Sequence, residues 1–341
     1  MLIDHHKLHF HPERVSQWRE SKTWEQAKSL YPLYVEVSPV GACNHRCTFC
    51  AVDYIGYKAV QWEGALLRER LREMGSLGVK SVMFAGEGEP LLHKQINSIV
   101  LAAKFAGIDT SFTTNGVLLD KLEVLPDVSW VKVSVNAGTR ETYSKVHRTK
   151  EDDWNKVWSA IERAVQRKGK CTIGVQMVVL PENENEVVRI YQMAADRGVD
   201  YVVLKPYSQH KFSVTHQYEN YRAPALVEHL KEPTKLYVRD DKPSHEPHQY
   251  EKCNATPNFW AYLMANGDLY SCSAYLLDPR FNLGSLKDKT FKEVWEGEKR
   301  RENWEFVRND LNISECRKNC RMDKANRYLW AFDRTEHVNF I

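Results

Sequence analysis

Six short runs rich in β-branched and aromatic residues alternate with segments of helical periodicity between Leu33 and Pro206, and this alternation constrains the fold most. Between the runs, apolar residues recur three and four positions apart, as at Leu67, Leu71 and Met74. Alternating strands and helices are typical of βα units and a parallel sheet. The sequence therefore predicts an α/β fold, with a partial barrel or an open sheet. The six predicted strands are Leu33–Val37, Val79–Phe84, Asp109–Thr113, Val128–Val135, Thr172–Leu180 and Tyr201–Lys205.

A second unit is expected beyond a polar stretch that begins after Tyr207 and ends in residues 239–248. Phe259–Met264 and Leu269–Ser273 flank an Asn-Gly turn, which is the strongest short-range signal for a β-hairpin. Thr290, with a glutamate three residues later, predicts the start of a short helix. The expected division is an N-terminal extension over 1–32, a barrel over 33–210, a connecting segment over 211–250 and a second domain over 251–341.

Charge and hydropathy exclude two classes of partner. The chain has 48 Lys and Arg against 45 Asp and Glu, which gives a formal net charge of +3. The basic residues do not gather in one arm, so the charge does not indicate a nucleic acid as partner. No apolar run reaches membrane-spanning length, and residues 1–40 lack the features of a secretory signal. We therefore expect no membrane partner and a cytoplasmic location. Four of the 13 histidines lie within residues 4–11, which we interpret as a polar surface arm without chemistry.

The eight cysteines fall into a set of three, a single residue and a set of four, and this clustering favours metal ligands over disulfides. Cys43, Cys47 and Cys50 follow the first predicted strand, at the carboxyl end where parallel βα folds place their active sites. Three thiolates can hold an iron–sulfur cluster and leave one iron open to a small molecule. Zinc with His45 as the fourth ligand is the alternative, although this spacing suits no common zinc pattern.

The C-x3-C-x2-C spacing, with Phe49 directly before the last cysteine, resembles the motif of the radical S-adenosylmethionine (radical SAM) superfamily. Residues 86–90, Gly-Glu-Gly-Glu-Pro, are similar to the family's Gly-Gly-Glu-Pro motif, with Glu87 in place of the second glycine. Residues 114–116, Thr-Asn-Gly, follow the third strand, and residues 134–136, Ser-Val-Asn, stand where relatives often carry Ser-x-Asp. The resemblance implies SAM-binding roles for the following residues: Phe49, Gly86, Glu87, Gly88, Glu89, Pro90, Thr114, Asn115, Ser134 and Asn136.

The resemblance, which covers about residues 33–205, also implies a chemistry. The first cysteine set would hold a [4Fe–4S] cluster that binds SAM and passes it one electron, with a flavodoxin or a ferredoxin as the electron donor. SAM would then give methionine and a 5′-deoxyadenosyl radical, which takes a hydrogen atom from a small-molecule substrate. The implied fold is a partial (β/α)6 barrel of the TIM type, followed by a small domain made of a β-hairpin and a helix.

That small domain resembles the auxiliary-cluster domains called SPASM and Twitch. Cys253 and Cys272 lie around the predicted hairpin, and Cys316 and Cys320 follow the short helix. Four cysteines are just enough to ligate one second [4Fe–4S] cluster completely, whereas a full SPASM domain carries more, so Twitch is the better match. A zinc ribbon is the alternative, because four thiolates also suit tetrahedral zinc.

Cys171 is interpreted as a buried inert thiol, with a hydrogen-atom donor as the sharper alternative. Lys205 and Tyr207 end the sixth strand and are candidates for substrate contact, where Lys205 would polarise or deprotonate a hydroxyl. We predict an oxidoreductase that takes two electrons from an alcohol carbon of a sugar, a sugar nucleotide or an aminocyclitol, with the auxiliary cluster as electron acceptor. The alternatives are a peptide-modifying enzyme, an epimerase that uses Cys171, and a non-catalytic iron–sulfur electron carrier.

Overall fold

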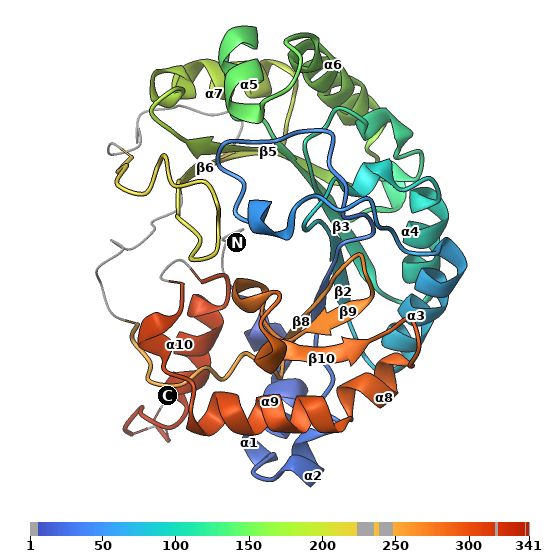
Figure 1. Cartoon of the computed structure of the whole chain (residues 1–341), viewed down its shortest axis with the longest axis vertical. Coiled ribbons are helices and arrows are strands. Elements are labelled where there is room, and N and C mark those ends of the chain that lie inside the picture. The colour runs from blue at the N-terminus through green and yellow to red at the C-terminus, as the bar shows by residue number, and fades with distance from the viewer. Residues whose placement is uncertain (1–5, 224–234, 239–247, 318–319, 338, 341) are drawn as a thin grey trace.

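The computed structural model describes residues 6–223, 235–238, 248–317, 320–337 and 339–340, and a single curved sheet forms its frame (Figure 1). The strand order is β10-β9-β8-β1-β2-β3-β4-β5-β6-β7. All neighbours from β8 to β7 along this order are parallel, whereas β8, β9 and β10 pair antiparallel. The strands are β1 Tyr34–Val37, β2 Ser81–Phe84, β3 Asp109–Thr114, β4 Trp130–Ser134, β5 Thr172–Val179, β6 Tyr201–Pro206, β7 Lys235–Val238, β8 Trp260–Leu263, β9 Asp268–Tyr270 and β10 Asn282–Ser285.

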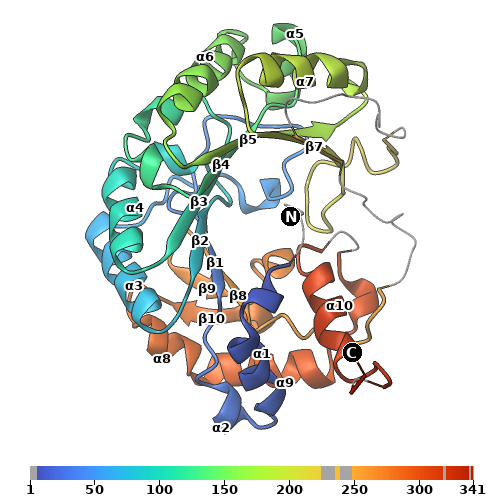
Figure 2. The same ribbon diagram turned by 180° about the vertical axis from the view of Figure 1, so that it is seen from behind.

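Helices cover the outer face of this sheet, and Figures 1 and 2 show those that connect successive parallel strands on the convex side of an incomplete barrel. Four of them connect successive parallel strands, as βα units require: α3 Gly64–Ser76, α4 Ile96–Phe105, α6 Asp152–Arg167 and α7 Val187–Asp196. The others are α1 Pro12–Glu20, α2 Trp24–Ala27, α5 Arg140–His147, α8 Phe291–Trp295, α9 Glu298–Asn309 and α10 Asp323–Ala331. The α/β class and the partial barrel predicted from the sequence are therefore confirmed.

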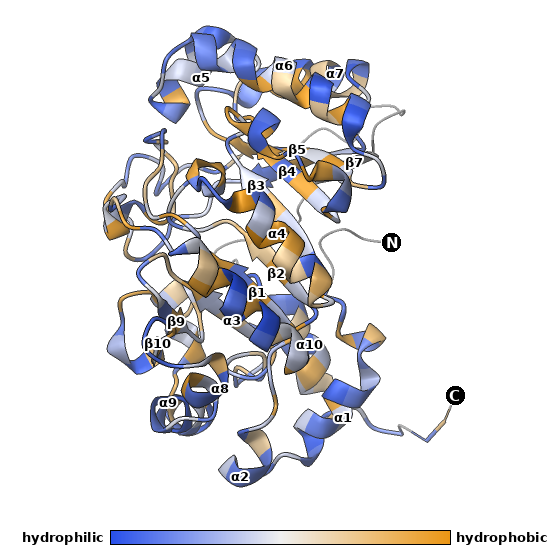
Figure 3. Cartoon of the chain, turned by 90° about the vertical axis from the view of Figure 1, so that its right-hand side faces the viewer, coloured by the Kyte–Doolittle hydropathy of each residue, from blue (hydrophilic) through white to orange (hydrophobic). Residues whose placement is uncertain are grey.

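The main hydrophobic core lies between the sheet and its helices. Side chains alternate between the two faces of a strand, so Val35 and Val37 of β1 join this core while Tyr34 and Glu36 face the barrel interior. Figure 3 shows the same division, since hydrophobic colour gathers on the sheet and hydrophilic colour on the outer turns of α1, α3 and α5. The interior face is consequently available for polar side chains.

Two features of the sheet differ from the sequence-based expectation. A seventh parallel strand, β7, pairs with β6 inside the segment expected to be a connection. This strand has only four residues, and its pairing with β6 stabilises it, so the sequence gives no clear local signal for it. Residues 239–247 of the expected connection lie outside the described residues. The hairpin of β8 and β9 forms at the predicted turn, but β8 also pairs with β1. The hairpin thereby covers an edge of β1 that would otherwise be open.

The N-terminal segment packs against the C-terminal helix. Leu8 and Val15 form a small core with Ala325 and Leu329 of α10. The ring of His6 lies 4.6 Å from the ring of Tyr328. The described part of the histidine-rich arm therefore has a packing role that its polar composition did not predict. Within the described residues, no helix is long and apolar enough to cross a membrane.

Candidate active site

The loop that follows β1 carries the first three cysteines, and contacts from other elements fix its backbone. The Thr48 amide donates a hydrogen bond to the Val146 carbonyl at the end of α5, at 2.9 Å. The Glu89 amide donates to the Ala42 carbonyl, also at 2.9 Å. The loop is therefore attached to the ends of β2 and α5, at the carboxyl end of the parallel strands.

The three thiols of this loop are free, partly buried and close enough to influence one another. Burial raises the pKa of Cys43 to about 11 and also raises the pKa of Cys47 and Cys50. The charge of Cys50 raises the pKa of the other two further. Three thiolates in this position are stable only beside a cationic group, so the donor set fits a bound metal cluster.

The spacing of the thiols argues against zinc. Within the described part of the chain, the only group of three potential ligands whose donor atoms all lie within 4.8 Å of one another is His45, Cys47 and His147. Four thiolates around zinc at about 2.3 Å stand roughly 3.8 Å apart. In neither cysteine set do three sulfurs all lie within 4.8 Å of one another, so neither set has the compact arrangement of a zinc site.

Glu89 ties the ends of β2 and β3 to the cysteine loop. Its buried carboxylate accepts hydrogen bonds from the Thr114 hydroxyl at 2.7 Å, the Asn115 amide at 2.8 Å and the Leu91 amide at 3.1 Å. The side chain of Asn115 donates to the side chain of Asn44, inside the cysteine loop, at 2.7 Å. The structure thus brings Glu89, Thr114 and Asn115 together beside the first cysteine set, and their contacts with SAM stay a prediction.

The two glycines of residues 86–90 allow close approach of backbone segments. Gly86 has a φ of 114°, and a Cβ there would lie 2.5 Å from the Tyr262 hydroxyl. A Cβ at Gly88 would lie 2.2 Å from the Val40 carbonyl and 2.4 Å from the Ala42 carbonyl. Gly88 therefore lies directly against the cysteine loop. Pro90 begins a short 3-10 helix over Pro90–Leu92 that Glu89 caps.

Glu87 points away from this arrangement and joins the barrel to the auxiliary hairpin. One carboxylate oxygen accepts a hydrogen bond from the Ala265 amide, at 3.0 Å, in the turn between β8 and β9. The side chain is buried, and burial raises its pKa to about 7. That Glu87 contacts SAM stays a prediction, and in this structure its hydrogen-bond partner lies in the hairpin.

The remaining residues with an implied SAM-binding role lie around the end of β4. Ser134 closes the strand on the interior face. Asn136 is fully buried; its Oδ1 accepts from the Val178 amide at 2.6 Å, and its Nδ2 lies 3.2 Å from Nε2 of His147. Phe49 sets its ring edge-on to His147, with the ring centroids 5.6 Å apart. A cofactor contact of Asn136 stays a prediction, because its polar side-chain atoms already have partners.

The second cysteine set gathers beside the β8–β9 hairpin. Burial raises the pKa of all four thiols, and the other three each raise that of Cys272. Asn326 of α10 donates to the sulfur of Cys253 at 3.4 Å, and the Tyr275 hydroxyl lies 3.4 Å from the sulfur of Cys316. The four thiols therefore face one site, as the sequence predicts: Cys253, Cys272, Cys316 and Cys320.

Tyr54 packs beside the second cysteine set, and sequence reasoning missed it. It follows Cys50 by four residues and packs against the same small apolar cluster as Cys272. Its ring stacks on His210 with the centroids 5.3 Å apart. No local sequence pattern distinguishes this tyrosine, because its position depends on how the loop after β1 packs against the C-terminal domain.

Polar side chains line the barrel interior near both sets. Strand alternation places Glu36 of β1, Lys132 of β4, Gln176 of β5 and Lys205 of β6 on this face. Glu36 forms an ion pair with Arg321, which directly follows Cys320. None of these four residues was predicted from the sequence, although the period of two in each strand and the cysteine beside Arg321 were available signals: Glu36, Lys132, Gln176 and Arg321.

The three residues considered as catalytic lie in different places. Lys205 faces the interior near the carboxyl end of β6, and Tyr207 follows it, with its hydroxyl 2.6 Å from Oε1 of Gln209. Burial raises the pKa of Tyr207 to about 12. Cys171 is only 2% exposed, belongs to the main core and directly precedes β5, at the amino end of the strands. It lies at the opposite end of the barrel from the cysteine loop, which corrects the idea that its thiol reaches a substrate there.

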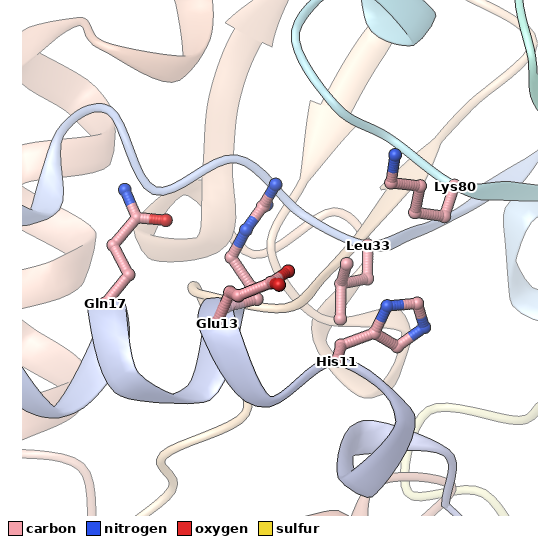
Figure 4. A pocket seen from close by; sticks show the side chains of 6 residues that line it. His11, Glu13, Gln17, Leu33 and Lys80 are labelled. Atoms are coloured by element: carbon pink, nitrogen blue, oxygen red, sulfur yellow. The ribbon is translucent and has the colours of Figure 1, made fainter.

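A surface pocket near the N-terminus lies at that same amino end (Figure 4). Leu33 directly precedes β1 and Lys80 directly precedes β2, so both are at the start of their strands. Active sites of parallel βα folds lie at the other end. The pocket is therefore separate from the candidate active site; its lining residues are His11, Glu13, Arg14, Gln17, Leu33 and Lys80.

Comparison with known families agrees with this geometry. Residues 37–194 match the radical SAM superfamily, and residues 253–321 match SPASM, an iron–sulfur cluster-binding domain. The chain is a radical SAM enzyme with a C-terminal SPASM domain. These two domains imply a SAM-binding [4Fe–4S] cluster, SAM and an auxiliary [4Fe–4S] cluster, which confirms the predicted cofactors.

Curated relatives match about half of this chain. The GTP 3′,8-cyclase of Chlorobaculum tepidum is 30% identical over 186 residues, which cover 52% of this chain and 55% of that protein. The GTP 3′,8-cyclase of Microcystis aeruginosa is 32% identical over 166 residues, which cover 45% of this chain and 50% of that protein. The chain thus spans about half the length of the curated relatives it matches.

Solved structures share the fold at low sequence identity. Streptococcus suis SuiB bound to S-adenosylmethionine has a TM-score of 0.59 at 18% identity, over 79% of this chain and 66% of that one. The protein anSMEcpe with bound AdoMet has a TM-score of 0.55 at 17% identity, over 91% of this chain and 96% of that one. Both similarities support the architecture of the radical SAM and SPASM parts.

Proposed function

We propose that this radical SAM enzyme is an oxidoreductase that converts an alcohol carbon of a polar small molecule to a ketone. The substrate would be a sugar, a sugar nucleotide or an aminocyclitol. The observation that supports this proposal is the placing of two cysteine sets, one of three and one of four, around a polar barrel interior. Arg321, next to Cys320 of the second set, pairs with Glu36 inside the barrel.

The two sets suit two different tasks. With SAM and both clusters bound, the site supplies one-electron chemistry that removes a hydrogen atom from carbon and accepts a second electron. In the overall reaction, the alcohol carbon gives one hydrogen to 5′-deoxyadenosine, the hydroxyl releases one proton, and methionine is the other product. The electron gained from the substrate equals the electron spent in cleaving SAM, so the reaction balances.

The residues of the chain then have to hold the substrate and receive the hydroxyl proton. Lys205 and Tyr207 lie at the carboxyl end of β6, where a substrate hydroxyl would meet them. Glu36 and Arg321 offer a carboxylate and a guanidinium to the polar groups of the same molecule. This division of roles is part of the proposal.

The test is a panel of sugars, sugar nucleotides and aminocyclitols, each deuterated at its carbinol carbons and incubated with SAM and a reductant. A substrate should give singly deuterated 5′-deoxyadenosine in a one-to-one ratio with a ketone. Cys272→Ala should stop ketone formation but retain SAM cleavage, whereas the matched control Cys171→Ala should retain both ketone formation and SAM cleavage. With unlabelled substrate in D₂O, a product that differs from the substrate only by configuration and one solvent-derived deuterium would show an epimerase and overturn the proposal.

A purine nucleotide is the second candidate substrate. The named GTP 3′,8-cyclases are about 30% identical over the matched half, and Lys132 and Lys205 bring positive charge to the barrel interior. GTP therefore belongs in the same panel. A cyclised nucleotide of unchanged oxidation state, formed only with GTP, would favour this candidate over alcohol oxidation.

The electron donor is part of the same proposal. We infer that a reduced flavodoxin or ferredoxin supplies the electron that starts each turnover. Replacing dithionite with either reduced protein should sustain formation of 5′-deoxyadenosine. If neither protein sustains it while dithionite does, this donor class is wrong and the oxidoreductase proposal is unaffected.

A further inference from the structure

His147 holds a fixed position against the first cysteine set. Its ring is 1% exposed and stacks on the ring of Tyr143 with the centroids 4.1 Å apart. Its own carbonyl accepts a hydrogen bond from the amide of Arg46, inside the cysteine loop, at 3.1 Å. Ring atom Nδ1 lies 3.4 Å from the sulfur of Cys47. Both the backbone and the ring of this residue therefore contact the loop.

The hydrogen-bond network decides which ring nitrogen carries the proton. The Val178 amide donates to Oδ1 of Asn136 at 2.6 Å, and a backbone amide can only donate, so this contact fixes the orientation of the Asn136 amide group. Nδ2 of Asn136 then points its hydrogen at Nε2 of His147, at 3.2 Å. The backbone amide of Asn136 points at the same nitrogen, at 3.4 Å. Nε2 is therefore an acceptor, and the proton of the neutral ring is on Nδ1.

The same contacts exclude other states of the ring. A doubly protonated ring would direct an N–H at two donors, and a ring protonated only on Nε2 would do the same. A separate metal ion on His147 would need a free lone pair, which neither nitrogen offers in this arrangement. The neighbouring His45 is also buried beside Cys47, but the structure records no hydrogen bond from its ring to a cysteine.

We propose that His147 donates an Nδ1–H hydrogen bond to the thiolate of Cys47 and thereby raises the reduction potential of the iron–sulfur cluster that Cys47 ligates. Hydrogen bonds to cluster sulfurs help set the reduction potential, because they stabilise the more negative, reduced state. His147 is thus a positioning residue that makes the first electron transfer easier. Asn136 fixes the tautomer of His147 by donating from Nδ2 to Nε2. An aspartate carboxylate has no such donor, so it could not fill this role.

The first test is a redox titration of the full-length holoprotein, followed by electron paramagnetic resonance. His147→Phe keeps a ring against Tyr143 but removes the donor, and it should lower the midpoint potential of the SAM-binding cluster. We expect the equilibrium constant for its reduction to fall roughly tenfold, which is about 59 mV for a one-electron couple. His147→Asn places an amide N–H near the position of Nδ1 and should recover most of the shift. The auxiliary cluster should keep its potential in both variants.

His45→Phe is the matched control, because it removes the other buried histidine beside Cys47 and should leave the potential unchanged. A His147→Phe protein that retains both clusters and shows no shift would overturn the proposal. So would an equal shift in the His45→Phe protein.

The second test needs no variant of His147 that folds. Wild-type holoprotein labelled with ¹⁵N in the histidine rings should show a weak ¹⁵N coupling to the reduced SAM-binding cluster in pulsed electron paramagnetic resonance. The coupling should persist in His45→Phe. Its absence from the wild-type spectrum, or its loss in His45→Phe, would contradict the hydrogen bond. Neither test uses a substrate, so both outcomes are independent of the proposed oxidation.

Discussion

Replacing Glu87 with glutamine should stabilise the protein by an amount that grows as the pH rises from 4.5 through 7. Glu87 is 3% exposed and accepts a hydrogen bond from the Ala265 amide. Burial is the main cause that raises its pKa from 4.5 to about 7, while the Ala265 amide and Lys58 act in the opposite direction. The structure therefore holds a carboxyl group whose charged form is the less stable one in the folded state.

The sign and size of the effect follow from this pKa. Between pH 4.5 and 7 the folded protein binds more protons at Glu87 than the unfolded chain does, so the free energy of unfolding falls as the pH rises through this range. The loss is complete by about pH 8 and amounts to about 3–4 kcal/mol, because the pKa rises from 4.5 to about 7 and each pKa unit corresponds to ~1.4 kcal/mol. Glutamine keeps a carbonyl oxygen for the Ala265 amide and has no charge. Glu87→Gln should thus recover up to this amount at pH 8 and nothing at pH 4.5.

Thermal unfolding of the reconstituted protein between pH 5 and 8.5 measures the effect. At this chain length about 3–4 kcal/mol corresponds to a rise in Tm of roughly 5 °C at pH 8. Glu63, which caps α3 through the amides of Ala65 and Leu66, is the matched control because these hydrogen bonds lower its pKa. Glu63→Gln should instead lower Tm at pH 8. If Glu87→Gln shifts Tm equally at pH 5 and pH 8, the change reflects packing and the electrostatic reasoning is refuted.

Three further outcomes are expected. The wild-type protein should hold about eight irons, and replacing Cys43, Cys47 and Cys50 together with alanine should leave about four and abolish SAM cleavage; zinc in the second site would contradict this count. Gly88→Ala should lower the free energy of unfolding by about 1–3 kcal/mol and reduce the iron bound in the first site, because the new Cβ meets two carbonyls of the cysteine loop. Thermal unfolding measures the stability and iron analysis measures the iron content. A variant with unchanged stability and iron content would show that the contact is not tight. Cys171→Ala should cost about 1 kcal/mol of stability and leave the iron content and the rate of SAM cleavage intact; a loss of activity at full iron content would restore a catalytic role for its thiol.

The ligand sets and the general fold could be predicted from the sequence because their signals are local. Cys43, Cys47 and Cys50 lie within eight residues of one another, so one loop presents all three wherever the sheet lies. The strands β1 to β6 were recognisable because hydrophobic alternation and the helices between them repeat along the chain. The Asn266-Gly267 turn determined the β8–β9 hairpin for a similar reason, since its conformation depends on two residues.

The direction in which each polar side chain points was decided by the tertiary structure. Glu87 looks like a substituted motif residue in the sequence, and only the pairing of β8 with β1 brings the Ala265 amide within its reach. Cys47 and His147 are 100 positions apart, yet they meet because α5 ends beside the cysteine loop. The sequence by itself therefore determined which groups bind clusters and where the strands run. Burial and long-range packing decided which side chains contact the cluster ligands and which join the barrel to the β8–β9 hairpin, because those contacts exist only in the folded chain.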